Sequence, residues 1–373
     1  MPVLGIPLAM WSVCALAASV QVAQVEGANI QRPVWGPDAS MLAWEANYHD
    51  RQSIELFLGD PDLRSYRRLG ASSGGSSLTQ GFRTQSGLGH VTSELAFAPP
   101  SVGWLVYTAS NAQHDLDLLI EGHGPVAMAR GADGGAAWSP DGRAIVFTSS
   151  RSGDGDLYLV QTAPGASTST PWLDTPPVRL TAEESGAELY ASWSHDSEQI
   201  VYVTRGPQGD HIWRVAREGG APRQLTAWPG SQILPRYSPV DRMIAFYANR
   251  ERKERFDLYL LSDTAGASPV LLASDVLPNS TGPAWTPDGR SVVYTARDDE
   301  AFNPICVVPI DYPAARQTLP LDTIGHGDIA VGGRPDGSVR VAYVAQGRAG
   351  EKNLSWKRLY VTELAPTGAF SPR

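Results

Sequence analysis

The chain has 373 residues, of which only 18% are charged, and its formal net charge is −9. This acidic balance disfavours a nucleic-acid-binding protein, which needs clustered Lys and Arg to displace counterions from phosphates. The 37 Gly and 29 Pro residues exceed the usual share of turn formers and predict many short elements instead of long helices. The 11 Trp, 13 Tyr and 8 Phe residues can build a large core and exclude wholesale disorder.

The N-terminal segment resembles an export signal. Residues 1–25 carry no charge, residues 3–18 are mostly apolar, and Ala15-Leu16-Ala17 offers a small-x-small cleavage site, although the usual basic residue near Met1 is missing. We expect residues 1–18 to be a signal peptide, which predicts a periplasmic or secreted protein; without a signal the protein would be cytoplasmic. No other segment has the ~18 uncharged apolar residues of a membrane span, so none is expected in the mature chain.

A motif recurs seven times between residues 33 and 364. The clearest copy reads Trp138-Ser139-Pro140-Asp141-Gly142-Arg143, and a second good copy covers residues 285–290. Successive copies lie 41 to 62 residues apart, which is the spacing of a repeat architecture. The aligned turn positions are Pro37, Pro99, Pro140, His195, Pro239, Pro287 and Pro335.

Each copy predicts four short strands. The first strand usually ends in an aromatic residue and leads into a Ser/Thr-Pro-Asp-Gly turn, where Pro presets φ, Asp caps the backbone and Gly supplies a left-handed residue. The third strand pairs an apolar residue with an aromatic one, as in Leu157-Tyr158, and the fourth is short, as at residues 223–226. The second strand carries an aromatic residue at a nearly fixed offset: Trp44, Tyr107, Phe147, Tyr202, Phe246, Tyr294 and Tyr343.

Such a four-stranded sheet cannot bury both faces alone, whereas sheets stacked radially can. The sequence therefore predicts an all-β fold, a seven-bladed β-propeller of four-stranded antiparallel blades, as one domain over residues 19–364 with a tail at 365–373. Six blades is the alternative, because the seventh copy has Gly333 in place of the aromatic residue. That copy also lacks a fourth strand, and the alternating stretch at residues 20–25 is predicted to supply it and to close the ring.

The Trp-Ser-Pro-Asp-Gly-Arg motif, followed by Phe147-Thr148-Ser149 and Asp156-Leu157-Tyr158, resembles the repeat of TolB-like β-propellers, relatives of WD-type repeats. The resemblance covers nearly the whole chain. It implies the propeller fold and a protein-binding role in a periplasmic cell-envelope complex. The same repeat resembles the propellers of prolyl oligopeptidase relatives and of oligogalacturonate lyases, and the latter resemblance implies a metal and histidines at the channel mouth.

Polar residues recur seven positions before the turn Pro, where first strands begin. These positions converge around one end of a propeller axis, so their carboxylates would form a negative mouth for a cation or a basic segment. Polar strand starts are equally expected in any wet channel. His90 and His326 precede first strands and could join a metal or an acidic ligand, although a loop histidine bonded to a carbonyl is the favoured interpretation. The candidate ligand-binding residues are Thr92, Asp133, Glu188, Gln232, Ser280, Asp328, His90 and His326.

No complete catalytic constellation is recognisable. Residues 70–74 match G-x-S-x-G, but they lie in a Ser/Gly-rich insertion without the strand-to-helix context of a nucleophile elbow. We expect no catalytic residue, no metal ligand set and no cofactor. A divalent cation bound at the channel mouth is kept as an alternative. The loops between second and third strands carry aromatic and Arg residues, which are enriched at interfaces. The candidate partner-binding residues there are Tyr48, Arg51, Arg151, Arg205, Arg250, Arg252 and Phe302.

Two hypotheses follow for function. The first is a non-catalytic scaffold, expected to be a monomer, that binds a protein or peptide across the channel mouth and the adjoining loops. The second is a metal-dependent lyase or hydrolase that acts on an anionic saccharide at the same mouth. The sequence favours the non-catalytic scaffold over the enzyme but does not decide between the two hypotheses.

Overall fold

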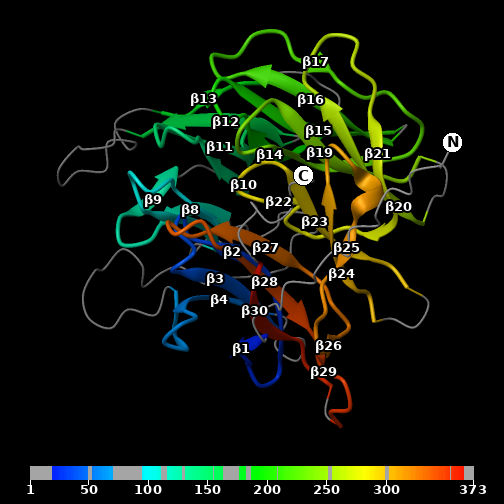
Figure 1. The fold of residues 1–373 in the computed structure, drawn as a ribbon. Coiled ribbons are helices and arrows are strands. Elements are labelled where there is room, and N and C mark those ends of the chain that lie inside the picture. The colour runs from blue at the N-terminus through cyan, green and yellow to red at the C-terminus, as the bar shows by residue number, and fades with distance from the viewer. Residues whose placement is uncertain are drawn as a thin grey trace, which may run out of the picture.

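The structure is a computed structural model in which regular structure is almost entirely β (Figure 1). It describes residues 19–48, 53–69, 95–110, 116–127, 131–153, 155–162, 176–181, 186–207, 209–250, 254–298, 302–352 and 354–364. The predicted signal peptide and C-terminal tail lie outside these ranges. No helix in the described ranges is long and apolar enough to cross a membrane.

The pairing of the described strands gives seven four-stranded antiparallel units, called blades 1 to 7 in chain order. Blade 1 contains β2 (Ala28–Trp35), β3 (Leu42–Tyr48), β4 (Ser53–Asp60) and β5 (Ser65–Arg68), and blade 2 contains β6 (Ala96–Phe97), β7 (Leu105–Ser110), β8 (Leu116–Ile120) and β9 (Gly124–Ala127). Blade 3 contains β10 (Asp133–Trp138), β11 (Ala144–Ser149), β12 (Asp156–Gln161) and β13 (Val178–Arg179), and blade 4 contains β14 (Glu188–Trp193), β15 (Gln199–Gly206), β16 (Gly209–Ala216) and β17 (Arg223–Gln224).

The last three blades are less regular. Blade 5 contains β18 (Gln232–Tyr237), β19 (Met243–Ala248), β20 (Phe256–Ser262) and β21 (Val270–Leu277), and blade 6 contains β22 (Ala284–Trp285), β23 (Ser291–Ala296), β24 (Ile305–Pro309) and β25 (Gln317–Thr318). These two blades share one sheet, because the end of β21 pairs with β23. A 3-10 turn, η2 (Pro313–Ala315), precedes β25, and a small sheet joins β26 (Thr323–Ile324) to β29 (Gly347–Arg348).

Blade 7 joins the two ends of the chain. It contains β27 (Ile329–Gly333), β28 (Val339–Ala345), β30 (Arg358–Leu364) and the N-terminal β1 (Val20–Ala23). Val20 lies opposite Val361 in the antiparallel pairing of β1 with β30, and Figure 1 shows these blue and red strands side by side. The predicted closure of the ring by an N-terminal strand is confirmed, and it covers an edge that would otherwise be exposed.

The core is a circuit of contacts between neighbouring blades. Seven buried apolar clusters each draw residues from two adjacent blades, and one of them joins blade 7 to blade 1. The predicted second-strand aromatic residues are all buried in these clusters, with Trp44, Phe147 and Tyr294 at 0% exposure. The β-propeller prediction is therefore confirmed, since each sheet stays dry through its neighbours.

The turns between first and second strands have the chemistry that their sequence predicts. Ser139 Oγ donates to Asp141 Oδ1 at 2.6 Å, and the same oxygen accepts the amide of Arg143 at 2.9 Å. Gly142 has φ +69°, a region that glycine adopts without steric cost. Two copies without glycine reach the same region, because Ala39 has φ +52° and Ser197 has φ +62°.

A repeated bulge in the first strand is absent from the sequence predictions. Five residues before the turn position, Arg32, Tyr190 and Leu234 have φ +49°, +60° and +54°, and each lies within a register shift of its ladder. Gly135 has φ +63° at the equivalent place in blade 3. A bulge bends its strand and re-aims the nearby side chains, so it sets what faces the centre of the ring.

The seventh copy lacks its aromatic residue for a steric reason. A Cβ on Gly333 would lie 2.8 Å from Pro287 of the preceding blade, and a Cβ on Gly332 would lie 2.7 Å from Trp35 of the following blade. Both neighbouring blades therefore press on β27, and no larger side chain fits there.

Candidate functional site

The connections of each blade divide the molecule into two faces. Because the strands are antiparallel, the Ser/Thr-Pro-Asp-Gly turns lie on one face, called the turn face. The loops between second and third strands, and the passages to the next blade, lie on the other, called the loop face. The predicted ligand residues begin first strands, so they belong to the loop face.

Glu188 and Gln232 connect neighbouring blades. Glu188 is 1% exposed, and its Oε2 accepts the amide of Leu157 in blade 3 at 3.0 Å and the hydroxyl of Thr181. Burial raises the pKa of Glu188 to about 7, against the opposing effect of these hydrogen bonds. Gln232 is fully buried and its Oε1 lies 2.9 Å from Nδ1 of His211 in blade 4. These two side chains hold blades together and do not open toward a shared ligand.

Asp133 is engaged within its own blade. Its carboxylate is 2.8 and 3.0 Å from Nη2 of Arg151, and the guanidinium of Arg151 lies over the ring of Tyr158 at 4.8 Å. Burial raises the pKa of Asp133 to about 6, although Ser149 and Arg151 favour its charged form. Arg151, predicted as a partner-binding residue, instead has a partner inside the fold.

Asp328 and Ser280 lie together at the junction of blades 6, 7 and 1. Asp328 Oδ1 accepts the amide of Ser280 at 3.0 Å, and Oδ2 accepts the amide of Arg32 at 2.9 Å. The two oxygens thus join three blades around one carboxylate. The Oγ of Ser280 is buried and has no hydrogen-bond partner among the described residues.

His326 is a loop histidine bonded to carbonyls. Nδ1 lies 3.0 Å from the carbonyl oxygen of Phe302 and 2.9 Å from that of Asn303, and Nε2 lies 2.9 Å from Oγ1 of Thr323. This network fits a neutral ring that donates from Nδ1 and accepts at Nε2. Burial lowers the pKa of His326, although the two carbonyls favour the charged form. Neither ring nitrogen is left for a metal in this arrangement.

His90, Thr92, Arg51 and Arg252 lie outside the described residues. Within the described ranges, no three His, Cys, Asp or Glu side chains are grouped so that they could hold a metal ion. The described candidates therefore do not form the negative, cation-binding mouth that the sequence suggested, because their carboxylates are engaged in separate contacts.

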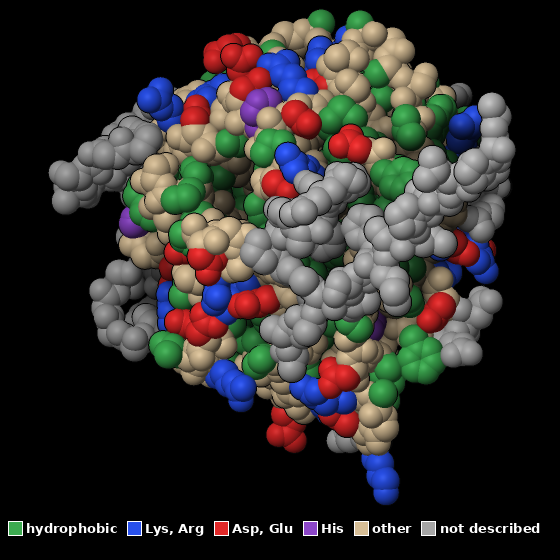
Figure 2. Space-filling view, viewed as in Figure 1, with side chains coloured by type: hydrophobic (Ala, Val, Ile, Leu, Met, Phe, Trp, Pro, Cys, Tyr) green, Lys and Arg blue, Asp and Glu red, His purple; other side chains and the backbone are tan. Residues whose placement is uncertain are grey.

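The candidate partner-binding loops divide in the same way. Tyr48 is 8% exposed and packs in the core between blades 7 and 1, so it is not a surface residue. Phe302 is 44% exposed. Arg205 pairs with Asp210 at 3.5 Å, and Arg250 lies over the ring of Trp228 at 4.7 Å. Both arginine side chains lie at the surface. Figure 2 shows basic and acidic side chains interspersed on the face in view.

A cavity of about 500 Å³ opens on the loop face where blades 6, 7 and 1 meet, and it is called the loop-face cavity. Carboxamide groups dominate its polar lining: Asn29, Gln31, Asn47, Asn303 and Gln346. Asp328, His326 and Lys357 supply its other ionisable groups, and a Cβ on Gly327 would lie 3.3 Å from Nζ of Lys357.

Three of the five carboxamides are held by the fold. Asn29 Oδ1 accepts the amide of Lys357 at 2.9 Å, Gln31 donates to Glu45 at 2.8 Å, and Asn303 Oδ1 accepts the amide of Asp298 at 3.4 Å. No hydrogen bond engages the side chains of Asn47 and Gln346 within the described ranges. The cavity thus combines fixed and available amide groups, which can donate to and accept from a ligand.

A second cavity, of about 350 Å³, lies among the first strands at the centre of the ring, and it is called the central cavity. Trp35, Trp138 and Trp193 from three blades line it, together with Arg32 and Arg236. Asp328 borders the loop-face cavity, whereas its partners Arg32 and Ser280 border the central cavity. The Asp328 contacts therefore lie between the two cavities.

Several solved structures have an architecture similar to that of this chain. TolB from Acinetobacter baumannii is 16% identical, over 79% of this chain and 67% of that one, with a TM-score of 0.54. An oligogalacturonate lyase in complex with manganese is 12% identical over 96% of both chains, with a TM-score of 0.59. The oligogalacturonate lyase of Vibrio parahaemolyticus is 11% identical over 94% of both chains, with a TM-score of 0.58.

The chain has a TolB-like β-propeller fold. No protein-family model matches its sequence, and no curated protein matches it either. At such low identities the likeness establishes the fold alone, so function must be argued from the residues of this TolB-like propeller.

Sequence reasoning missed most residues of the two cavities. The carboxamides sit at strand ends: Asn29 and Gln31 begin the first strand of blade 1, and Asn47 ends the second strand. Arg32 and Arg236 are the charged residues of the first strands β2 and β18. An ionisable residue within such a strand was the available signal, but the bulges that aim these side chains leave no consistent mark in the sequence.

Proposed function

We propose that this TolB-like propeller is a non-catalytic scaffold that binds a peptide segment of a partner protein in the loop-face cavity. The observation that carries the proposal is the lining of five carboxamides in one cavity of about 500 Å³. A carboxamide presents the same donors and acceptor as a peptide bond, so this lining complements the N–H and C=O groups of an extended chain.

The charges of the cavity refine the kind of peptide. The amine of Lys357 beside Gly327 is its basic group, while both oxygens of Asp328 already accept backbone amides. An acidic side chain of the peptide would pair with Lys357. The exposed ring of Phe302, next in sequence to the cavity residue Asn303, offers an apolar contact at the rim. The favoured ligand is therefore an extended segment with an acidic and an apolar residue.

The location of the protein is part of this proposal. The resemblance to TolB-like propellers and the uncharged N-terminal segment favour export to the periplasm. Cell fractionation of a C-terminally tagged chain should place it with periplasmic markers. Recovery with cytoplasmic markers would contradict this part of the proposal without affecting the binding site.

A peptide-display selection on the purified full chain tests the binding site. Selected peptides should bind in isothermal titration, and Asn47→Leu and Gln346→Leu should each weaken binding by about tenfold, because each removes hydrogen bonds to the peptide. Gln317→Leu is the matched control, since Gln317 is an exposed carboxamide on the outer strand β25. Peptides whose affinity is the same for all three variants would overturn the proposal.

The alternative function is a lyase or hydrolase on an anionic saccharide. The combination of Lys357 with carboxamides also suits carboxylate and hydroxyl groups of a sugar, and oligogalacturonate lyases share the fold over nearly the whole chain. The described residues do not supply a metal site there, since His326 and Asp328 are both engaged. Release of unsaturated product from trigalacturonate, measured by ultraviolet absorbance with and without manganese, would favour this alternative over the scaffold.

A further inference from the structure

The two arginines of the central cavity are already engaged by the fold. The guanidinium of Arg32 pairs with the fully buried carboxylate of Glu45 at 3.5 Å. Arg236 donates to the carbonyl oxygens of Thr281 at 2.8 Å and Tyr190 at 3.3 Å. An anionic ligand would have to displace these partners, and a cationic ligand would find no Asp or Glu among the described residues that line the cavity. The walls therefore favour a neutral ligand, which has no charge to desolvate on entering.

One tryptophan of the lining has no acceptor for its indole N–H. Trp138 is 8% exposed, and its Nε1 has no hydrogen-bond partner among the described residues. The tryptophans at the same place in three other blades each donate to a carbonyl of the preceding blade: Trp193 to Ala137 at 3.0 Å, Trp35 to Ala330 at 3.2 Å and Trp285 to Arg236 at 3.0 Å. A buried donor left unpaired is costly, so the indole of Trp138 points to an acceptor that a ligand supplies.

Two further features belong to this donor. The ring of Trp104 packs edge-on against that of Trp138, with centroids 6.3 Å apart, which holds the indole in a fixed orientation. Ser280, another lining residue, has a buried Oγ that also lacks a hydrogen-bond partner in the part of the chain that the structure describes. The cavity thus offers an indole N–H and a hydroxyl that the fold does not use.

Much of the remaining lining is aromatic or aliphatic. The rings of Trp35, Trp193 and Phe97 border the same cavity, together with side chains of Val, Leu and Ala. Aromatic rings pack well against other planar groups in offset or edge-to-face arrangements. The volume of about 350 Å³ is within the range of small-molecule sites.

We propose that the central cavity binds a neutral planar group that carries a hydrogen-bond acceptor, such as an aromatic ring next to a carbonyl. The carbonyl oxygen accepts from Nε1 of Trp138, with Oγ of Ser280 as a second donor, while the ring packs between the tryptophans. Such a group belongs either to a small molecule or to an aromatic residue of a partner chain. This site is separate from the loop-face cavity and does not depend on the function proposed there.

Three probes of the same shape test the charge of the ligand. Benzamide is neutral, benzoate is its anionic isostere and benzamidine is its cationic isostere. In titrations of the full wild-type chain, benzamide should bind at least about tenfold more tightly than either ion. Equal or tighter binding of either ion, or no binding of benzamide at millimolar concentration, would overturn the proposal. This comparison needs no variant and does not depend on whether a variant folds.

A pair of variants tests the donor. Trp138→Phe keeps an aromatic ring and removes the unpaired N–H, so it should weaken benzamide binding about tenfold. Trp193→Phe is the matched control, because it also replaces an indole of the lining, but one whose Nε1 already donates to the Ala137 carbonyl. The control should weaken binding by less than about threefold. Equal losses in the two variants would overturn the role of Trp138.

The indole resonance of Trp138 reports the contact directly. Its cross-peak in a nitrogen–proton correlation spectrum is the one that is absent from the spectrum of Trp138→Phe. Saturating benzamide should move the proton shift of this cross-peak downfield, because the N–H gains an acceptor. A cross-peak that does not move would overturn the proposed hydrogen bond.

A peptide arm distinguishes the two sources of the ligand. N-acetyl-phenylalaninamide and N-acetyl-Gly-Phe-Gly-amide are both neutral and are titrated alongside benzamide. Tighter binding of the longer peptide identifies a partner chain, and equal or weaker binding identifies a small molecule; either result supports the site if Trp138→Phe weakens it. Binding that is the same in Trp138→Phe would count against the site. Failure here leaves the Asn47 and Gln346 results untouched, so the two proposals are judged separately.

Discussion

The carboxylates at the two faces of the propeller behave in opposite ways. On the turn face, hydrogen bonds from Ser40 lower the pKa of Asp38, and hydrogen bonds from Ser194 and Arg242 outweigh burial and lower that of Asp196 to about 2. At the strand starts of the loop face, burial raises the pKa of Asp133 to about 6 and that of Glu188 to about 7. The same repeat thus stabilises charge at one end and penalises it at the other.

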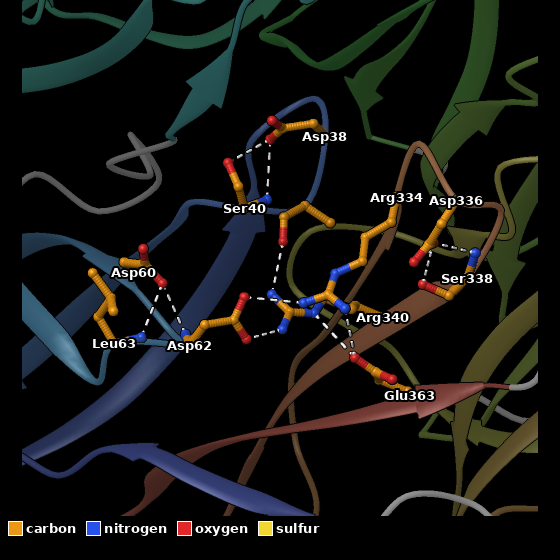
Figure 3. A network of polar contacts seen from close by, with 11 residues as sticks. Asp38, Ser40, Asp60, Asp62, Leu63, Arg334, Asp336, Ser338, Arg340 and Glu363 are labelled. Carbon is orange, nitrogen blue, oxygen red and sulfur yellow. Dashed lines mark hydrogen bonds and ion pairs between the residues drawn. The ribbon is translucent and has the colours of Figure 1, made fainter.

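The turn face also carries the ion pairs that close the ring. Figure 3 shows Arg340 of blade 7 reaching blade 1, where it donates to the carbonyl of Ala39 at 2.9 Å and pairs with Asp62. Arg334 pairs with Asp62 and with Glu363, each at 3.0 Å. The loop face instead has the larger cavity and carboxamides that the fold leaves available. The turn face therefore uses ion pairs to join the ends of the ring, whereas the loop face also leaves some polar side chains available to bind.

The largest expected effect tests the ring closure. Arg340 is 4% exposed, so Arg340→Ala should lower the free energy of unfolding by about 2–3 kcal/mol. The substitution leaves the Ala39 carbonyl without its hydrogen-bond donor and removes the buried aliphatic part of the Arg340 side chain. Urea unfolding measures the change. Arg67→Ala, which breaks an exposed pair with Glu121, should cost less than about 1 kcal/mol. Equal losses in the two variants would contradict a special role for the closure.

The close approach of blades at β27 gives the next effect. Gly332→Ala should destabilise by about 1–3 kcal/mol, because its Cβ would lie 2.7 Å from Cγ of Trp35 and 2.9 Å from Cβ of Ala39. Gly350→Ala is the control. Gly350 has φ +87° and no atom within 4 Å of its Cβ position, so this substitution should cost only backbone strain of about 1 kcal/mol. A thermal unfolding midpoint measured for both variants separates packing from strain.

The raised pKa of Glu188 predicts a pH dependence. Its folded-state value of about 7 lies above the ordinary 4.5, so between these values the folded chain keeps a proton that the unfolded chain releases. Stability should therefore fall as pH rises from about 4.5 to about 7. Glu188→Gln should reduce this slope and stabilise the protein at neutral pH by on the order of 1–2 kcal/mol.

Unfolding measured at both ends of that pH range checks this prediction. Glu198→Gln is the control, since that side chain is 70% exposed on the turn face. The dependence of stability on pH should not vanish entirely in Glu188→Gln, because Asp133 also has a raised pKa. A wild-type chain that gains stability across the same range would show that the buried carboxyls do not dominate.

The smallest expected effect concerns the loop-face cavity. Lys357→Gln should change the free energy of unfolding by less than about 0.5 kcal/mol, because its amine makes no ion pair among the described residues. The same variant should weaken binding of acidic peptides. A large loss of stability would show that Lys357 supports the fold, and the contrast between the faces would then be less sharp.

The repeat, the propeller and the strand that closes it could all be predicted from the sequence. Local chemistry was sufficient for these features: the Ser/Thr-Pro-Asp-Gly turn fixes its own geometry, and the alternating second strands with aromatic residues such as Phe147 require neighbours on both faces. The turn copies at Ala39 and Ser197 show that the register of the blade holds the turn even without glycine.

Which polar residues bind neighbours and which remain available depends on contacts between strands and blades that the sequence does not specify. Glu188, Asp133 and Asp328 look alike in the sequence, yet each meets a different partner, because the partner comes from another strand or blade. The two cavities likewise combine residues distant in the chain, such as Asn29 with Gln346 and Arg32 with Arg236. Periodicity specifies the direction of a side chain within its own blade, but contacts across blades depend on bulges and packing that arise when the ring closes.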